Sequence, residues 1–240
     1  MDARAGLFPH DHGPIYAETD LARFPVEPLS VLSNGLFLII VLYWVWRLRG
    51  RWRQYPLLSL SVPILAVGLV GGTVYHATRS AEVWLIMDFL PIAVLALTAC
   101  VYFWRALLGR WGTAGLAGVA PVVAFAILTR VSGLPESVSY SAGYSMLAGN
   151  ILFPMILHCA LYHRNAWPWL AASVASFLVA VFFRQADAWV GLHLFAAGSH
   201  WLWHLWGAAS TFFLMQYLYA WEAAGGSAPR APLTSSRPTR

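Results

Sequence analysis

The chain has 240 residues, of which 59% are hydrophobic and 10% are charged, and its formal net charge is +5. A soluble domain carries roughly a quarter charged residues, so this composition excludes a water-exposed globule and indicates a lipid-embedded protein. All 15 basic residues are arginines, and they lie between apolar runs rather than in a free basic patch. That arrangement is typical of membrane topology and argues against nucleic-acid binding.

Residues 1–28 form a polar N-terminal segment that four prolines interrupt, and it lacks the apolar core of a signal peptide. Seven apolar runs follow, each near the roughly 20 residues that span a bilayer. They cover residues 30–47, 56–76, 83–107, 113–130, 142–162, 167–184 and 192–221. We therefore expect an all-α integral membrane protein, with seven transmembrane helices in one domain over residues 29–221. Residues 222–240 are rich in Gly, Ser, Pro and Ala and are expected to be a disordered tail.

The distribution of arginines predicts the orientation of the helices. The connections after the first, third and fifth predicted helices, together with the C-terminal tail, hold ten arginines, and the other side holds five, Arg79 and Arg184 among them. The positive-inside rule places the richer side in the cytoplasm. The N-terminus is then expected outside, in a periplasm or an organelle lumen, and both a bacterial inner membrane and a eukaryotic endomembrane fit.

Two histidines, His200 and His204, lie in the last predicted helix with the spacing i, i+4. That spacing puts both imidazoles on one helical face, as in helical zinc motifs. No glutamate lies between them, which excludes the metalloprotease motif. For this pair alone, interhelical hydrogen bonding and metal binding are equally good interpretations.

Two further ionisable residues are expected in the same layer of the membrane. His76 ends the second predicted helix, and Asp88 lies near the start of the third. The expected topology places both in the outer half of the membrane, where His200 and His204 also fall. Three imidazoles with an open water position make a catalytic zinc site, and Asp88 would act as its base or orient the water. Taken alone, a histidine at a helix end is more often structural, whereas an aspartate inside a spanning helix is costly and favours a functional interpretation.

Other polar residues have structural interpretations. Cys100 and Cys159 lie inside apolar runs and are interpreted as small buried hydrophobes. His158 is interpreted as a packing histidine, Asp187 as a helix cap or surface residue, and residues 10–12 as a solvated tail.

Three carboxylates precede the first predicted helix on the expected outer side. Glu18, Asp20 and Glu27 lie within ten residues of one another. They are interpreted either as a solvated interfacial stretch or as hard oxygen ligands for Ca²⁺. Spacing alone favours the solvated stretch.

Four motifs together resemble the alkaline ceramidase family, within the superfamily of seven-helix membrane hydrolases that includes the progestin and adiponectin receptors. The first two are Tyr16 to Glu18, which resembles an aromatic-Cys-Glu opening, and Glu27 to Asn34. The others are Gly71 to Thr78, followed by Asp88 to Pro91, and His200 to His204. They occur in the family's order over essentially the whole membrane part.

The resemblance implies a site with two metals. A Zn²⁺ would be held by His76, His200 and His204, with a water oriented by Asp88. A Ca²⁺ would be held by the acidic N-terminal segment, through Glu18, Asp20 and Glu27.

The chain also departs from the family pattern. Ala17 replaces the Cys of the opening motif, and Ile15 stands where an acidic residue is expected. Gly72 replaces the Ser one helical turn before the first histidine. Thr73, at i−3 from His76, lies on that face and is predicted to supply the catalytic hydroxyl instead.

The implied reaction is hydrolysis of a ceramide amide to a sphingoid base and a fatty acid, a step of sphingolipid metabolism. The partners would be the bilayer and a ceramide-like lipid, whose amide lies near the headgroup layer. Two alternatives remain: a hydrolase of the same superfamily acting on another lipid amide or ester, and a non-enzymatic receptor or sensor on this scaffold. A haem-binding electron carrier is less favoured, because His200 and His204 share one helix instead of facing each other.

Overall fold

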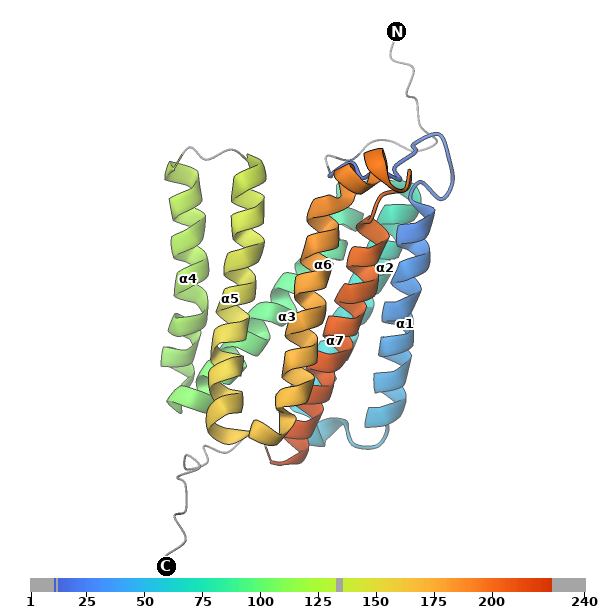
Figure 1. Ribbon diagram of the computed structural model, residues 1–240. Coiled ribbons are helices and arrows are strands. Elements are labelled where there is room, and N and C mark those ends of the chain that lie inside the picture. The colour runs from blue at the N-terminus through green and yellow to red at the C-terminus, as the bar shows by residue number, and fades with distance from the viewer. Residues whose placement is uncertain (1–10, 12, 133–135, 226–240) are drawn as a thin grey trace, which may run out of the picture. The chain divides into compact units, whose positions relative to one another are not determined.

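The computed structural model describes residue 11 and residues 13–132 and 136–225, which contain seven long α-helices and no strand. The long helices are α1 (Pro28–Leu48), α2 (Pro56–Thr78), α3 (Glu82–Leu108), α4 (Trp111–Val131), α5 (Glu136–Tyr162), α6 (Trp167–His193) and α7 (His200–Ala223) (Figure 1). Two single 3₁₀ turns, η1 (Trp52–Gln54) and η2 (Arg164–Ala166), precede α2 and α6. The all-α prediction is confirmed for this part of the chain.

Six helical segments, one from each of α1 to α6, are long and apolar enough to cross a membrane. Large apolar side chains on these helices point away from the protein: Ile39, Leu116 and Phe182 are 63%, 69% and 64% exposed. Such exposure is unfavourable in water and favourable against lipid. The helix α7 is not among the six; it carries the two histidines and several Trp and Tyr residues. The helices indicate a multi-pass membrane protein.

The boundary between the last two helices differs from the prediction. The helix α6 continues to His193 instead of ending at residue 184, and α7 begins at His200 instead of residue 192. Arg184, which we expected in a connection, lies inside α6 with its guanidinium 5.3 Å from the ring centre of Trp203. An arginine predicts the end of an apolar run, but an aromatic partner lets the helix continue past it. Arg184 therefore does not belong to the five arginines that the prediction counted on the outer side.

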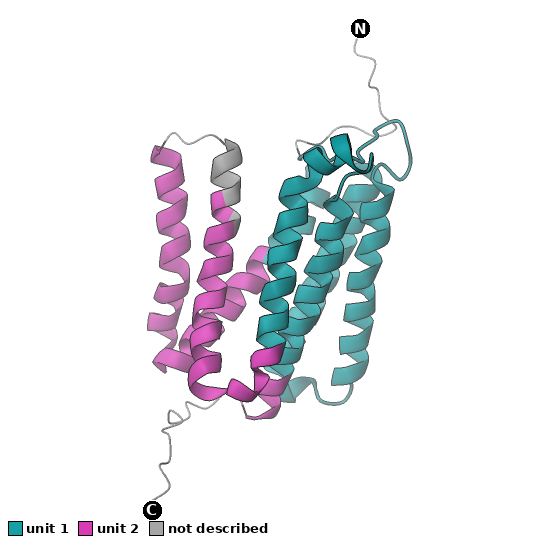
Figure 2. Ribbon diagram, in the orientation of Figure 1, with its two compact units in different colours: residues 1–92, 169–219 teal, residues 93–168, 220–240 magenta. Residues whose placement is uncertain are grey.

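The contacts within the chain divide it into two compact units (Figure 2). Unit 1 comprises Met1–Ile92 and Trp169–Tyr219, and unit 2 comprises Ala93–Pro168 and Ala220–Arg240. The boundaries fall inside α3, α6 and α7, where the sequence indicated a single domain. The helix α7 runs to Ala223, and residues 226–240, where a disordered tail is expected, lie outside the described residues.

Aromatic rings form much of the interior of unit 1. Trp44 and Tyr217 are fully buried. The ring of Trp44 lies 5.7 Å from that of Tyr219, on which Tyr55 stacks at 4.7 Å. Such offset and tilted pairs add to the hydrophobic gain from burial.

Unit 2 has a separate interior. Phe103 stacks on Trp221 at 4.8 Å, and the ring of His158 lies 4.5 Å from that of Trp221. Cys100 and Cys159 are free and buried. The interpretation of the two cysteines as buried hydrophobes is confirmed, and His158 packs against aromatic rings as expected.

One glycine brings α2 against α3 in unit 1. A Cβ on Gly71 would lie 2.5 and 2.7 Å from the backbone carbonyl carbon and oxygen of Met87, which is closer than van der Waals contact allows. Only glycine therefore permits this approach of the two helices. It sets His76, just over one turn further along α2, near Asp88, which follows Met87 on α3.

Candidate metal centre

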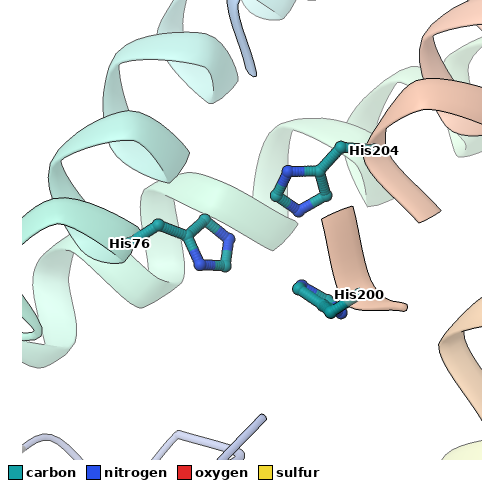
Figure 3. Close-up of side chains that lie close together, drawn as sticks. All are labelled: His76, His200 and His204. Atoms are coloured by element: carbon teal, nitrogen blue, oxygen red, sulfur yellow. The ribbon is translucent and has the colours of Figure 1, made fainter. Parts of the chain in front are cut away.

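Three histidines from two helices converge at one end of unit 1 (Figure 3). His76 lies in the last turn of α2, His200 is the first residue of α7, and His204 follows one turn later. All three are buried. One ring nitrogen of each lies within 4.8 Å of the other two, and among the described residues no other three side chains of His, Cys, Asp or Glu converge in this way.

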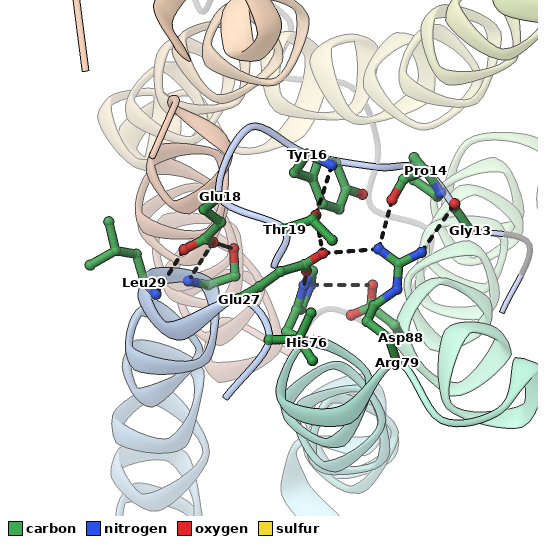
Figure 4. Close-up of polar contacts among 12 residues, drawn as sticks. Gly13, Pro14, Tyr16, Glu18, Thr19, Glu27, Leu29, His76, Arg79 and Asp88 are labelled. Carbon is green, nitrogen blue, oxygen red and sulfur yellow. Dashed lines mark hydrogen bonds and ion pairs between the residues drawn. The ribbon is translucent and has the colours of Figure 1, made fainter. Parts of the chain in front are cut away.

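Glu27, the residue before α1, orients the imidazole of His76 (Figure 4). Its Oε2 accepts a hydrogen bond from His76 Nδ1, and its Oε1 accepts from Thr19 Oγ1 at 2.5 Å and from Arg79 Nη1 at 2.9 Å. Burial raises the pKa of Glu27, but the bonds from His76 and Thr19 and the charge of Arg79 outweigh burial and hold this pKa below its ordinary value. A carboxylate only accepts, so His76 Nδ1 carries the proton and Nε2 keeps its lone pair. Carboxylate–histidine pairs of this kind orient metal ligands.

Three other contacts orient the remaining imidazoles. His204 Nδ1 lies 3.2 Å from the carbonyl oxygen of Ser30 and 3.1 Å from the hydroxyl of Ser33, both on α1. The carbonyl only accepts, so His204 also carries its proton on Nδ1 and directs the lone pair of Nε2 elsewhere. The ring of Tyr16 stacks on His200, with the centroids 3.4 Å apart and the planes at 14°.

Arg79 ties the N-terminal segment over the end of α2. It is 1% exposed and adopts a left-handed backbone conformation (φ 49°) just after the helix. Its guanidinium donates to both carboxylate oxygens of Asp11, at 2.8 and 2.7 Å, and to the carbonyl oxygens of Gly13 and Pro14. Asp11 was expected in a solvated tail, and that interpretation is wrong, because a buried guanidinium needs an anionic partner. Residues 10 and 12 lie outside the described residues.

The donor set fits zinc. Nε2 of His76 and Nδ1 of His200 are buried and have no hydrogen-bond partner among the described residues, and such orphaned atoms are rare in proteins. Tetrahedral zinc with bonds of about 2.0–2.1 Å holds its nitrogens roughly 3.4 Å apart. The observed nitrogens, within 4.8 Å of one another, are spread somewhat wider than this. Three imidazoles also leave the fourth position of zinc open for water or substrate.

Asp88 lies beside this cluster, in the second turn of α3. Its Oδ2 is 4.0 Å from His76 Nε2, and its side chain is 31% exposed. That distance is longer than a hydrogen bond, so the carboxylate lies beside the imidazole without being bonded to it. The four residues that the sequence predicted for one membrane layer thus come together at one end of unit 1.

The catalytic role of Thr73 stays a prediction. The residue that faces Asp88 is its neighbour Gly72, where a Cβ would collide with Asp88 Oδ1. No hydrogen bond joins the Thr73 hydroxyl to Asp88 or to the three histidines within the described part of the chain. Nothing in this geometry directs the hydroxyl to the cluster.

The structure does not gather the three N-terminal carboxylates into one metal-holding group. Glu18 caps α1: its two oxygens accept from the backbone N–H groups of Leu29 and Ser30, each at 2.9 Å, and from the Ser30 hydroxyl. Asp20 is exposed and accepts from the backbone two residues on. Glu27 is engaged with His76. Calcium binding by these residues stays a prediction, and each carboxylate already has donors from the protein.

Asp187, on α6, joins the start of α7 to the N-terminal segment. Its Oδ1 accepts from the backbone N–H groups of Ser199 at 2.7 Å and His200 at 2.8 Å, and its Oδ2 accepts from that of Ala17 at 2.9 Å. The expectation of a capping role is confirmed. A carboxylate at a helix N-terminus satisfies orphan donors and faces the positive end of the helix dipole. The sequence contained no sign of which N–H groups it would cap.

We expect replacement of Asp187 with alanine to loosen the metal centre. The change leaves three N–H groups without an acceptor, and an unsatisfied buried donor costs about 1–3 kcal/mol. Thermal unfolding should shift to lower temperature, and the affinity for zinc should fall because His200 begins the helix that loses its cap. Asp187→Asn keeps one carbonyl acceptor and should lose less. An unfolding temperature and a zinc affinity equal to those of the wild type in Asp187→Ala would contradict this role.

Comparisons with known proteins do not place the chain in a family: no family model matches it, and no curated protein matches it in sequence. The motifs and the geometry of the histidine cluster are therefore the features that indicate its function.

Proposed function

We propose that the protein is a zinc-dependent membrane amidase that hydrolyses a ceramide-like lipid to a sphingoid base and a fatty acid. The observation that carries this proposal is the convergence of His76, His200 and His204 within 4.8 Å, with Asp88 4.0 Å from one of them. Buried imidazoles oriented by a carboxylate, with a second carboxylate left beside them, make the donor set of a hydrolytic zinc site.

The residues around the cluster have separate roles in the proposed hydrolysis. Bound zinc supplies a nucleophilic water near neutral pH and polarises a carbonyl oxygen. Glu27 and the carbonyl of Ser30 hold two of the imidazoles in the tautomer that directs Nε2 inward. Asp88 accepts the proton of the attacking water and returns it to the departing amide nitrogen.

The proposed membrane placement is seven spans with the cluster on the periplasmic or lumenal side. His76 lies in the last turn of α2 and His200 at the start of α7, so the cluster lies close to one end of the helices. The connection between α1 and α2, at the other end of α1, carries the arginines of residues 47–53, and the positive-inside rule assigns it to the cytoplasm. A ceramide presents its amide at the headgroup layer, which is the depth of a site near helix ends.

The test is incubation of the purified, zinc-loaded protein in liposomes with ceramides of several chain lengths and with other N-acyl and ester lipids. We expect equimolar release of sphingoid base and fatty acid, detected by mass spectrometry and stopped by a zinc chelator. If the protein hydrolyses another lipid amide or ester but no ceramide, it is instead a hydrolase for that lipid. A zinc-loaded protein that releases no product from any lipid would reject the hydrolase and favour a receptor.

A further inference from the structure

Asn34, in the second turn of α1, is a buried amide without a hydrogen-bond partner for its nitrogen. The residue is 4% exposed, and its Nδ2 has no partner among the described residues. Most buried amides in proteins are satisfied, so an orphaned donor at this depth needs an explanation.

The orphaned nitrogen lies beside the carboxylate of the metal centre. Both Asn34 Nδ2 and Asp88 Oδ1 lie within 3.3 Å of the point where a Cβ on Gly72 would stand. Gly72 precedes His76 by four residues, so this point is on the same face of α2 as the imidazole. Figure 4 shows Asp88 and His76 facing each other across this end of unit 1. A donor from α1, a carboxylate from α3 and an imidazole from α2 thus meet around one glycine.

The backbone of α1 holds Asn34 in register with the histidines. The preceding residue, Ser33, contacts His204 Nδ1 at 3.1 Å through its hydroxyl, and Ser30 contacts the same nitrogen through its carbonyl oxygen. Glu18 caps the first turn of this helix through Ser30. A donor on a helix fixed in this way is preorganised, which is what stabilisation of a developing charge requires.

We propose that Asn34 donates a hydrogen bond through Nδ2 to the carbonyl oxygen of the substrate amide. This inference rests on the proposed function. When the water oxygen adds to the carbonyl carbon, the C=O pair moves onto the carbonyl oxygen, which then accepts the Asn34 N–H bond. Asp88 holds the water proton at that moment and is neutral, so it does not repel the new charge. When the C=O bond re-forms, the C–N bond breaks and the nitrogen takes the proton from Asp88.

The kinetic test uses Asn34→Ala, which removes the donor, and Asn34→Asp, which has the same shape and no N–H. A donor that acts mainly in the transition state contributes about 10²–10³ in kcat, so we expect that loss in both variants, with little change in KM and full zinc content. The matched control is Asn150→Ala in α5, an amide whose Nδ2 donates to the Gly118 carbonyl at 2.9 Å; it should keep the wild-type kcat. Wild-type kcat in Asn34→Ala would overturn the inference.

A second measurement uses the wild-type protein and needs no turnover. The chain has three asparagines, Asn34, Asn150 and Asn165, so selective ¹⁵N-asparagine labelling gives three side-chain amide signals. The probe is a C16 ceramide analogue in which a phosphinate, –P(O)(O⁻)–CH₂–, replaces the amide group –C(O)–NH–. We expect the probe to shift the Asn34 signal and leave the other two unchanged. Probe binding without that shift overturns the inference alone, whereas a zinc-loaded protein that neither binds the probe nor hydrolyses ceramide overturns the proposed function as well.

Discussion

Replacement of His204 with alanine is expected to abolish both zinc binding and amide hydrolysis. Its imidazole is one of three that converge among the described residues, and with two ligands left the site can no longer hold zinc tightly. The zinc content of the purified variant, measured by metal analysis, should fall from near one per chain to near zero. Hydrolysis should fall by roughly 10³-fold or more, because no other group lowers the pKa of water to the same extent.

The matched control for this variant is His158→Ala. His158 is also a buried histidine on a long helix, but it packs on Trp221 in unit 2. Its loss should leave a cavity and lower the unfolding temperature while the zinc content stays near one per chain. Zinc retained in His204→Ala, or hydrolysis at the wild-type rate, would contradict the assignment of the metal centre.

Replacement of Asp88 with asparagine is expected to abolish most of the hydrolysis and leave zinc in place. The amide has the shape of the carboxylate, but it cannot accept the proton of the attacking water. Loss of a general base costs about 10²–10⁴ in rate. Comparison of the lipids produced by the wild type and by Asp88→Asn from one ceramide mixture, together with metal analysis, measures both quantities.

Glu82→Gln is the control on the same helix. Glu82 is exposed in the first turn of α3, about two turns before Asp88, and its neutralisation should leave the rate unchanged. Two results would overturn the role of Asp88. Hydrolysis at the wild-type rate in Asp88→Asn would show that another group accepts the proton. Loss of zinc from that variant would show that Asp88 is a zinc ligand instead of a base.

The helices were largely predictable because lipid allows few alternatives. An apolar run of about 20 residues in a bilayer must pair its own backbone groups, which leaves a helix as the local solution. The structure accordingly places both ends of each helix from α1 to α4 within two residues of the predicted ends. The boundary of α6 was wrong because Arg184 was treated as the end of the span, and its ring partner Trp203 lies 19 positions further along the chain.

The candidate site was predictable only in part. The pair His200 and His204 follows from helical spacing, and the shared layer with His76 and Asp88 follows from alternating helix direction. The residues that orient these side chains follow no comparable pattern in the sequence. Arg79 meets Asp11 across 68 positions and Glu27 across 52, and no local rule connects residues so far apart.

The amino-acid sequence by itself determined that this chain is helical, lipid-embedded and equipped with histidines in one layer, because hydropathy and helical periodicity act over neighbouring residues. Only the tertiary structure decided that the imidazoles face one another, that Glu27 holds the first of them, and that Gly72 leaves Asn34 and Asp88 beside the same point. Those outcomes depend on how closely helices approach, and that distance is set by packing between segments remote in the chain.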